Sequence, residues 1–146
     1  MATERTARVT WSGDLTSGRG RIESVGSGAL GGLDVTWASR AEQPQGRTSP
    51  EELIAAAHAA CFSMALANVL GKQGAPPERL DVEARVTFVP GTGITASALS
   101  VRARVPGIDA GAFRAAAEDA RDNCPVSQAL QGNVDLGIDA ALESSG

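Results

Sequence analysis

Two cysteines and the single histidine are the side chains of this sequence best suited to chemistry. Cys61 and Cys124 lie far apart and form no CxxC pair, and His58 precedes Cys61 by three residues. A structural zinc site usually takes four Cys or His ligands, so these three residues exclude one. Sequence motifs for iron–sulfur clusters and haem are absent as well. The remaining chemistry is that of the thiol: nucleophilic attack, oxidation and disulfide formation.

The surroundings of the two cysteines predict different reactivities. Cys124 precedes Pro125, at the expected start of a short helix over residues 125–131. Unpaired backbone N–H groups and the positive end of the helix dipole favour a thiolate there. Cys61 lies in the middle of an expected helix, where only a cation from elsewhere would lower its pKa. From the residues alone Cys124 is the more reactive thiol, and the alternative is that both cysteines are small core residues.

Two arginines and one glutamate are candidates to control the Cys61 thiol. Arg40 and Arg47 are the possible cations, and Glu51 would hold an arginine in place. Glu51 and Cys61 are separated by about 15 Å along a helix and about 80° around it, so they do not touch. Arg40, expected on an adjacent strand, would span much of that gap while pairing with the Glu51 carboxylate.

His58 suggests a Cys–His hydrolase, because it lies one helical turn before Cys61. Such an enzyme also needs a third group that orients the imidazole ring, and the sequence offers none nearby. We therefore interpret His58 as a core or interface histidine whose hydrogen bonds are satisfied. The hydrolase stays as an alternative.

Short strands and helices must position these residues. Apolar segments separated by Ser-Gly and Gly-Gly turns predict antiparallel strands over residues 7–11, 20–25 and 33–37. A polar loop follows. Ser49, Pro50 and Glu52 then predict the start of a long helix, with a capping box between Ser49 and Glu52.

The second half of the sequence alternates between apolar and polar residues. This two-residue period is typical of half-buried strands, which are expected over residues 80–89, 99–105 and 134–140. Asp109 can cap a helix that runs to about Asp122. The order of the elements predicts an α+β fold, and the length predicts a single domain, 1–146.

Composition and charge exclude several classes of function. The net charge of −4, the pI near 5.0 and the scattered basic residues argue against nucleic-acid binding. Residues 1–10 lack the apolar core of a secretory signal, so we expect a cytoplasmic protein. Residues 53–70 are long enough to span a membrane, but they are rich in alanine and interrupted by polar residues. We expect this helix to be buried in the protein or at a subunit interface, with no membrane partner.

Three segments resemble those of the OsmC/Ohr family, the osmotically inducible and organic hydroperoxide resistance proteins. Residues 48–66, TSPEELIAAAHAACFSMAL, are similar to the family signature and match the OsmC branch best. Residues 123–130, NCPVSQAL, resemble the segment with the resolving cysteine. Residues 105–110, VPGIDA, resemble the lead-in to the second helix. The resemblance extends over residues 9–142.

The resemblance implies roles for four residues. The family's peroxidatic cysteine falls on Cys61 and its resolving cysteine on Cys124, which reverses the order of reactivity expected from the helix ends. The catalytic glutamate falls on Glu51, and the arginine that ends the third strand of OsmC-type proteins falls on Arg40. Ohr-type proteins draw their arginine from a glycine-rich turn, which makes Arg19 the alternative. Neither a metal nor a bound cofactor is implied.

The implied activity is that of a Cys-based peroxidase that reduces organic hydroperoxides. The Cys61 thiolate would become a sulfenic acid, which Cys124 would resolve as a disulfide. An external dithiol, of the lipoyl type or another, would then reduce the disulfide. The family resemblance also implies an intertwined homodimer, with antiparallel sheets wrapped around long buried central helices. A non-catalytic redox sensor or stress-binding protein on the same fold is the alternative function.

Overall fold

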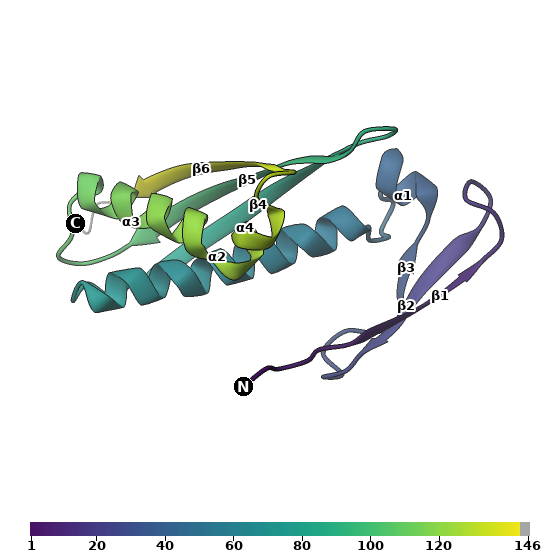
Figure 1. Cartoon of the computed structure of the whole chain (residues 1–146), viewed down its shortest axis with the longest axis horizontal. Coiled ribbons are helices and arrows are strands. Elements are labelled where there is room, and N and C mark those ends of the chain that lie inside the picture. Colours follow the sequence, from purple (N-terminus) through teal and green to yellow (C-terminus); the bar gives the residue numbers. More distant parts are fainter. Residues whose placement is uncertain (144–146) are drawn as a thin grey trace. The chain divides into compact units, whose positions relative to one another are not determined.

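The computed structural model describes residues 1–143 and contains two compact units (Figure 1). The first is Met1–Leu53, and the second begins at Ile54, so the boundary falls within the long helix α2. Each unit combines helices with a three-stranded sheet, which confirms the predicted α+β class. The single domain expected for residues 1–146 stays a prediction.

The sheet of the first unit is antiparallel, as predicted. Its strands are β1 (Ala7–Ser12), β2 (Arg19–Val25) and β3 (Leu33–Val35), in that order across the sheet. The strand β3 is shorter than expected, because the chain continues into a short helix, α1 (Trp37–Ala41).

Thr36 and Ser39 explain why the third strand ends early. The Thr36 Oγ1 atom accepts a hydrogen bond from the Ser39 N–H at 3.0 Å, and the Ser39 Oγ atom accepts one from the Thr36 N–H at 3.0 Å. This reciprocal pair is a capping box, which favours a helix start over a continued strand. The expectation that Arg40 ends a strand is therefore wrong, because Arg40 lies in α1.

Helix α2 (Pro50–Lys72) begins where the sequence predicted. The Ser49 Oγ atom accepts the backbone N–H of Glu52 at 3.2 Å, which is half of the expected capping box. The other half is wrong, because the Glu52 carboxylate accepts a hydrogen bond from the Thr48 hydroxyl at 3.0 Å. Beyond the helix, the backbone turns at Gly74, whose φ of 75° suits glycine.

The sheet of the second unit contains β4 (Arg79–Val89), β5 (Gly93–Arg104) and β6 (Asp135–Leu142), in that order. Strands β4 and β5 form an antiparallel hairpin, whereas β6 runs parallel to β5. The expectation of purely antiparallel sheets is thus wrong for β6. Parallel neighbours require a long crossover, which the helices α3 (Ala110–Asn123) and α4 (Pro125–Leu130) supply. Cys124 lies between these two helices.

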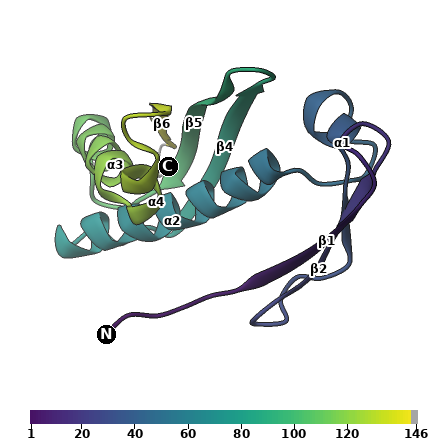
Figure 2. The ribbon, with the colours of Figure 1, turned by 45° about the vertical axis from the view of Figure 1, so that its right-hand side comes forward.

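One face of the second sheet carries the hydrophobic core. Helices α2 and α3 lie side by side on that face (Figures 1 and 2), and both contribute to one buried cluster with strand β5. The helix α3 contributes mainly small side chains, which let it pack closely. The fully or almost fully buried members are Phe62, Leu66, Leu70, Leu99, Val101, Ala103, Val105, Phe113, Ala116, Ala117, Ala120 and Cys124.

Helix α2 is buried along one face only. Phe62, Leu66 and Leu70 are 0% exposed, whereas Met64 is 74% exposed. The expected burial within the protein is thus found on one face of α2, and burial of the other face at a subunit interface stays a prediction. By length and composition α2 could cross a membrane. A core helix passes the same test, and the buried face of α2 packs against protein over several turns.

Asp109→Ala is expected to lower the free energy of unfolding by about 1 kcal/mol, because the Asp109 carboxylate caps α3. Its Oδ1 atom accepts the Ala112 N–H at 2.8 Å. Urea unfolding followed by circular dichroism measures the change. The matched control is Asp122→Ala, which removes an exposed ion pair with Arg121 and should change little. Equal losses in the two variants would contradict the capping role.

Candidate active site

Cys61 and Cys124 come together in the second unit. Cys61 lies in α2 and is half-buried, whereas Cys124 lies between α3 and α4 and is 0% exposed. Both are free thiols, and Cys61 packs against the buried cluster that contains Cys124, whose side chain affects the pKa of Cys61. One of two neighbouring thiols can thus be reached from outside while the other cannot. This arrangement allows a disulfide to form after the outer thiol has been oxidised.

The immediate neighbours of Cys61 favour its neutral thiol. Burial raises the pKa of Cys61 above its ordinary value. The backbone N–H of Val126 has the opposite, smaller effect and lowers it. Cys124 raises the pKa of Cys61 further, through its side chain and through charge repulsion when both thiols are ionised. A reactive thiolate at Cys61 therefore needs a cation beyond these neighbours.

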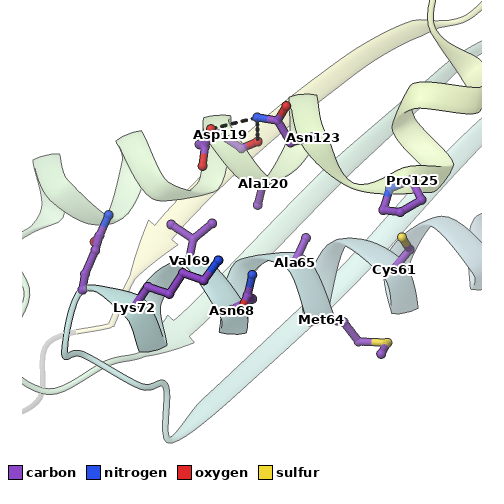
Figure 3. A pocket seen from close by; sticks show the side chains of 11 residues that line it. Cys61, Met64, Ala65, Asn68, Val69, Lys72, Asp119, Ala120, Asn123 and Pro125 are labelled. Carbon is purple, nitrogen blue, oxygen red and sulfur yellow. Dashed lines mark hydrogen bonds between the residues drawn. The ribbon is translucent and has the colours of Figure 1, made fainter.

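Cys61 lines a groove of about 690 Å³ between α2 and α3 (Figure 3). Near the sulfur its walls are formed by Ala65, Ala120 and Pro125. Polar side chains also line the groove. Asn123 donates to the Asp119 carboxylate at 2.8 Å, and Lys72 projects from the end of α2, far from Cys61. The groove therefore suits a ligand with an apolar body.

Arg40 and Glu51 form an ion pair within the first unit. The Arg40 Nε atom lies 2.7 Å from Glu51 Oε1 and 3.2 Å from Oε2. Glu51 is only 6% exposed, whereas the Arg40 side chain is 31% exposed. A buried carboxylate is costly unless it is paired, so Glu51 holds the guanidinium firmly. The structure thus brings Arg40 and Glu51 together, and their role at Cys61 stays a prediction.

The other two candidate arginines lie elsewhere in the first unit. Arg19 begins β2, and Arg47 lies in the exposed loop after α1. Both line a polar hollow of about 270 Å³ together with Asp34. Arg40 is thus the arginine among the three candidates that pairs with Glu51.

His58 is 0% exposed and bridges two serines. Its Nδ1 atom lies 2.6 Å from Ser97 Oγ on β5, and its Nε2 atom lies 2.8 Å from Ser127 Oγ on α4. Burial lowers the pKa of His58, so the ring is neutral. The prediction of a histidine with satisfied hydrogen bonds is confirmed. A hydrolase in which His58 activates Cys61 loses support, because the serines engage both ring nitrogens.

Sequence reasoning missed the two serines. Ser97 occupies an inward position of β5, in the register that carries the buried Leu99 and Val101. A serine in an apolar register is a signal for a buried polar partner. Ser127 gives a weaker signal, because α4 is too short to show a clear apolar face. Among residues 1–143, no three His, Cys, Asp or Glu side chains gather in a way that would hold a metal ion.

Comparison with known sequences places the chain among redox proteins. A family model described as OsmC-like protein matches residues 43–139. Peroxiredoxin OsmC of Escherichia coli strain K12 is 41% identical over 139 residues, which cover 93% of this chain and 96% of that protein. Organic hydroperoxide resistance protein OhrA of Bacillus subtilis strain 168 is 33% identical over 104 residues, 70% of this chain and 73% of that protein.

Solved structures share the mixed α+β fold. A crystal structure from Legionella pneumophila, named as an organic hydroperoxide resistance protein OsmC and predicted redox protein, matches with a TM-score of 0.68 and 27% identity. The match covers 93% of this chain and 96% of the Legionella chain. The crystal structure of OhrB of Bacillus subtilis matches with a TM-score of 0.67 and 28% identity, covering 94% and 98% of the two chains.

The buried His58 is expected to make folding stability depend on pH below its ordinary pKa of 6.5. The unfolded chain takes up a proton near pH 6.5, whereas the folded chain does so only at lower pH. The stability that comes from keeping His58 neutral is therefore fully present above pH 6.5. It is lost as the pH falls toward the folded-state pKa of His58. Urea unfolding of the wild type and of His58→Gln from pH 8 to pH 5 should give a shallower slope in the variant. Identical slopes would show that His58 is not held neutral.

Proposed function

The chain belongs to the OsmC-like protein family, and from this membership we propose that it is a Cys-based peroxidase that reduces organic hydroperoxides to alcohols. The observation that carries the proposal is the contact between a half-buried thiol, Cys61, and a fully buried one, Cys124. Relatives named as a peroxiredoxin and as organic hydroperoxide resistance proteins support a peroxidase-type role. The apolar walls of the groove beside Cys61 suit the organic part of such a substrate.

The proposed reaction has two covalent steps. The Cys61 thiolate attacks the terminal oxygen of the hydroperoxide, the O–O bond breaks, and the alkoxide takes a proton and leaves as the alcohol. Cys61 is then a sulfenic acid. The Cys124 sulfur attacks the Cys61 sulfur, the S–O bond breaks, and water leaves as the disulfide forms. An external dithiol, of the lipoyl type or another, reduces the disulfide and completes the cycle.

Arg40 and Glu51 are assigned the activation of Cys61. Burial raises the pKa of the Cys61 thiol, so a positive charge is required to populate the thiolate. Arg40 supplies that charge in the proposal, and the 2.7 Å ion pair with Glu51 holds it in one orientation. Arg19 is the alternative source.

We also propose that two chains form an intertwined homodimer, in which α2 becomes a buried central helix. Support comes from the exposed face of α2, where alanines and the 74% exposed Met64 present apolar surface to solvent. We also propose a cytoplasmic location, because it fits the peroxidase cycle. The disulfide must be reopened in each cycle, and dithiol reductants operate in a reducing compartment.

Cys61→Ser is expected to abolish turnover, whereas Cys124→Ser should still react once, because only Cys61 attacks the peroxide. The assay follows consumption of cumene hydroperoxide with dihydrolipoamide or thioredoxin supplied, and labels the sulfenic acid with dimedone. A redox sensor would instead stop after one equivalent per wild-type chain. Multiple turnovers in Cys61→Ser would refute the proposal.

Arg40→Ala is expected to slow the attack on hydroperoxide by about tenfold or more, since each unit of thiol pKa changes the thiolate fraction about tenfold. Stopped-flow measurement of sulfenic acid formation gives the rate, and circular dichroism verifies the fold. Arg19→Ala is the matched control and should keep the wild-type rate. A loss in Arg19→Ala alone would move the assignment to Arg19.

A further inference from the structure

A continuous line of short contacts joins a buried base to the resolving thiol. The His58 Nε2 atom lies 2.8 Å from Ser127 Oγ, and this oxygen lies 3.1 Å from Cys124 Sγ. Cys124 in turn is a neighbour of Cys61 and raises its pKa. At the other side of the ring, His58 Nδ1 lies 2.6 Å from Ser97 Oγ. The line therefore runs from β5, through α2 and α4, to the two sulfurs.

The members of this line are shielded from solvent. His58, Ser97, Ser127 and Cys124 are each 0% exposed. A thiol attacks as its thiolate, so Cys124 must give up a proton when it attacks Cys61. Water is a weak base and the folded chain leaves no exposed surface on this sulfur, so at neutral pH water accepts the proton slowly. A protein base connected to Cys124 by hydrogen bonds would accept it faster.

We propose that Ser127 and His58 form a buried relay that takes the proton from the Cys124 thiol as it closes the disulfide. This inference rests on the proposed function, in which Cys124 resolves an oxidised Cys61. Ser127 touches the reacting sulfur, and His58 acts through Ser127 as the proton acceptor. Neither residue has a part in the attack of Cys61 on the hydroperoxide.

The hydrogen bonds permit a single consistent arrangement for this transfer. When Nδ1 carries the hydrogen and donates it to Ser97, the Nε2 lone pair faces the Ser127 hydroxyl. The Ser127 oxygen then accepts the S–H of Cys124. Burial lowers the pKa of His58, which keeps the ring neutral and able to accept a proton. The backbone N–H of Ser127 also points to Cys124 Sγ, at 3.3 Å, and stabilises negative charge there.

The atoms of the step balance without any additional reactant. The Cys124 proton moves to Ser127 Oγ while the Ser127 proton moves to His58 Nε2, and the sulfur electron pair forms the S–S bond. The S–O bond of the Cys61 sulfenic acid breaks, and hydroxide leaves from Cys61 into the groove. When the external dithiol reduces the disulfide, Cys124 leaves as a thiolate and takes the proton back from His58 through Ser127, while a proton released by the dithiol converts the hydroxide to water. His58 is neutral again after each cycle.

The test separates the resolving step from peroxide chemistry. The reagent dithiobis-nitrobenzoate reacts first with the half-buried Cys61 and releases one thionitrobenzoate, and Cys124 then displaces the second from the mixed disulfide. Stopped-flow absorbance therefore gives two phases, the second of which is the attack by Cys124. Ser127→Ala and His58→Gln are expected to keep the first phase and to slow the second by about tenfold or more. The double variant should be no slower than the slower single variant, because a relay works as a unit.

Ser63→Ala is the matched control. The Ser63 hydroxyl donates to the Ala59 carbonyl at 2.7 Å within α2, away from the relay, so both phases should keep their wild-type rates. A repeat at alkaline pH separates loss of the relay from a shift of Cys124 away from Cys61. Hydroxide ionises the Cys124 thiol without a relay, so the second phase of both relay variants should return to the wild-type rate. A shifted Cys124 would stay slow at alkaline pH. The ionisable groups along the relay are His58, Cys124 and Cys61, and Asp119 of α3 faces the same groove as Cys61.

Three results would overturn the relay. They are a wild-type protein without a second phase, relay variants whose second phase stays within about twofold of wild type, and variants that lose both phases equally. If one variant does not fold, the other carries the test. A protein that shows both phases yet consumes no organic hydroperoxide would reject the proposed peroxidase, and the comparison of the second phases would still decide the relay.

Discussion

The contact between the Cys61 and Cys124 side chains is the interaction on which the rest of this structure depends. It requires a residue in the middle of α2 to meet the junction of α3 and α4, two segments far apart in the sequence. Helices α2 and α3 lie on one face of the β4–β5–β6 sheet. The parallel pairing of β6 with β5 forces the chain to cross that face through α3 and α4. The small, buried Ala116, Ala117 and Ala120 keep α3 close to the core. The topology therefore delivers the second sulfur to the first.

Burial gives this contact a chemical cost as well as a geometric benefit. The surroundings that hold the two sulfurs together also raise the pKa of the Cys61 thiol, because a thiolate loses solvation there. A nucleophile at this position is useful only when a cation offsets the burial. In the proposed function that cation is Arg40, which the nearly buried Glu51 carboxylate binds at 2.7 Å. The proposed function thus combines a buried pair of thiols with a buried pair of charges.

The buried polar residues of the second unit also constrain how its elements pack. A histidine within an otherwise apolar helix would destabilise the core if its ring nitrogens had no partners. Ser97 of β5 and Ser127 of α4 satisfy both nitrogens, and they fix α2 relative to the sheet and to α4. Because Ser127 also contacts Cys124, the same hydrogen bonds that stabilise the core reach the sulfur chemistry.

The sequence by itself determined the features that depend on neighbouring residues: the caps at Ser49 and Asp109, the strand periods, and the cysteine motifs that reveal the family. These follow from hydrogen bonds and burial patterns within a few residues. Only the tertiary structure decided that β6 runs parallel to β5 and that His58 bridges two serines. Each of these contacts joins distant segments, whose register is set by packing of the whole core rather than by any local pattern. The short helix α1 shows where sequence patterns mislead. Its apolar residues indicated that the strand continues, but the Thr36–Ser39 capping box starts a helix there.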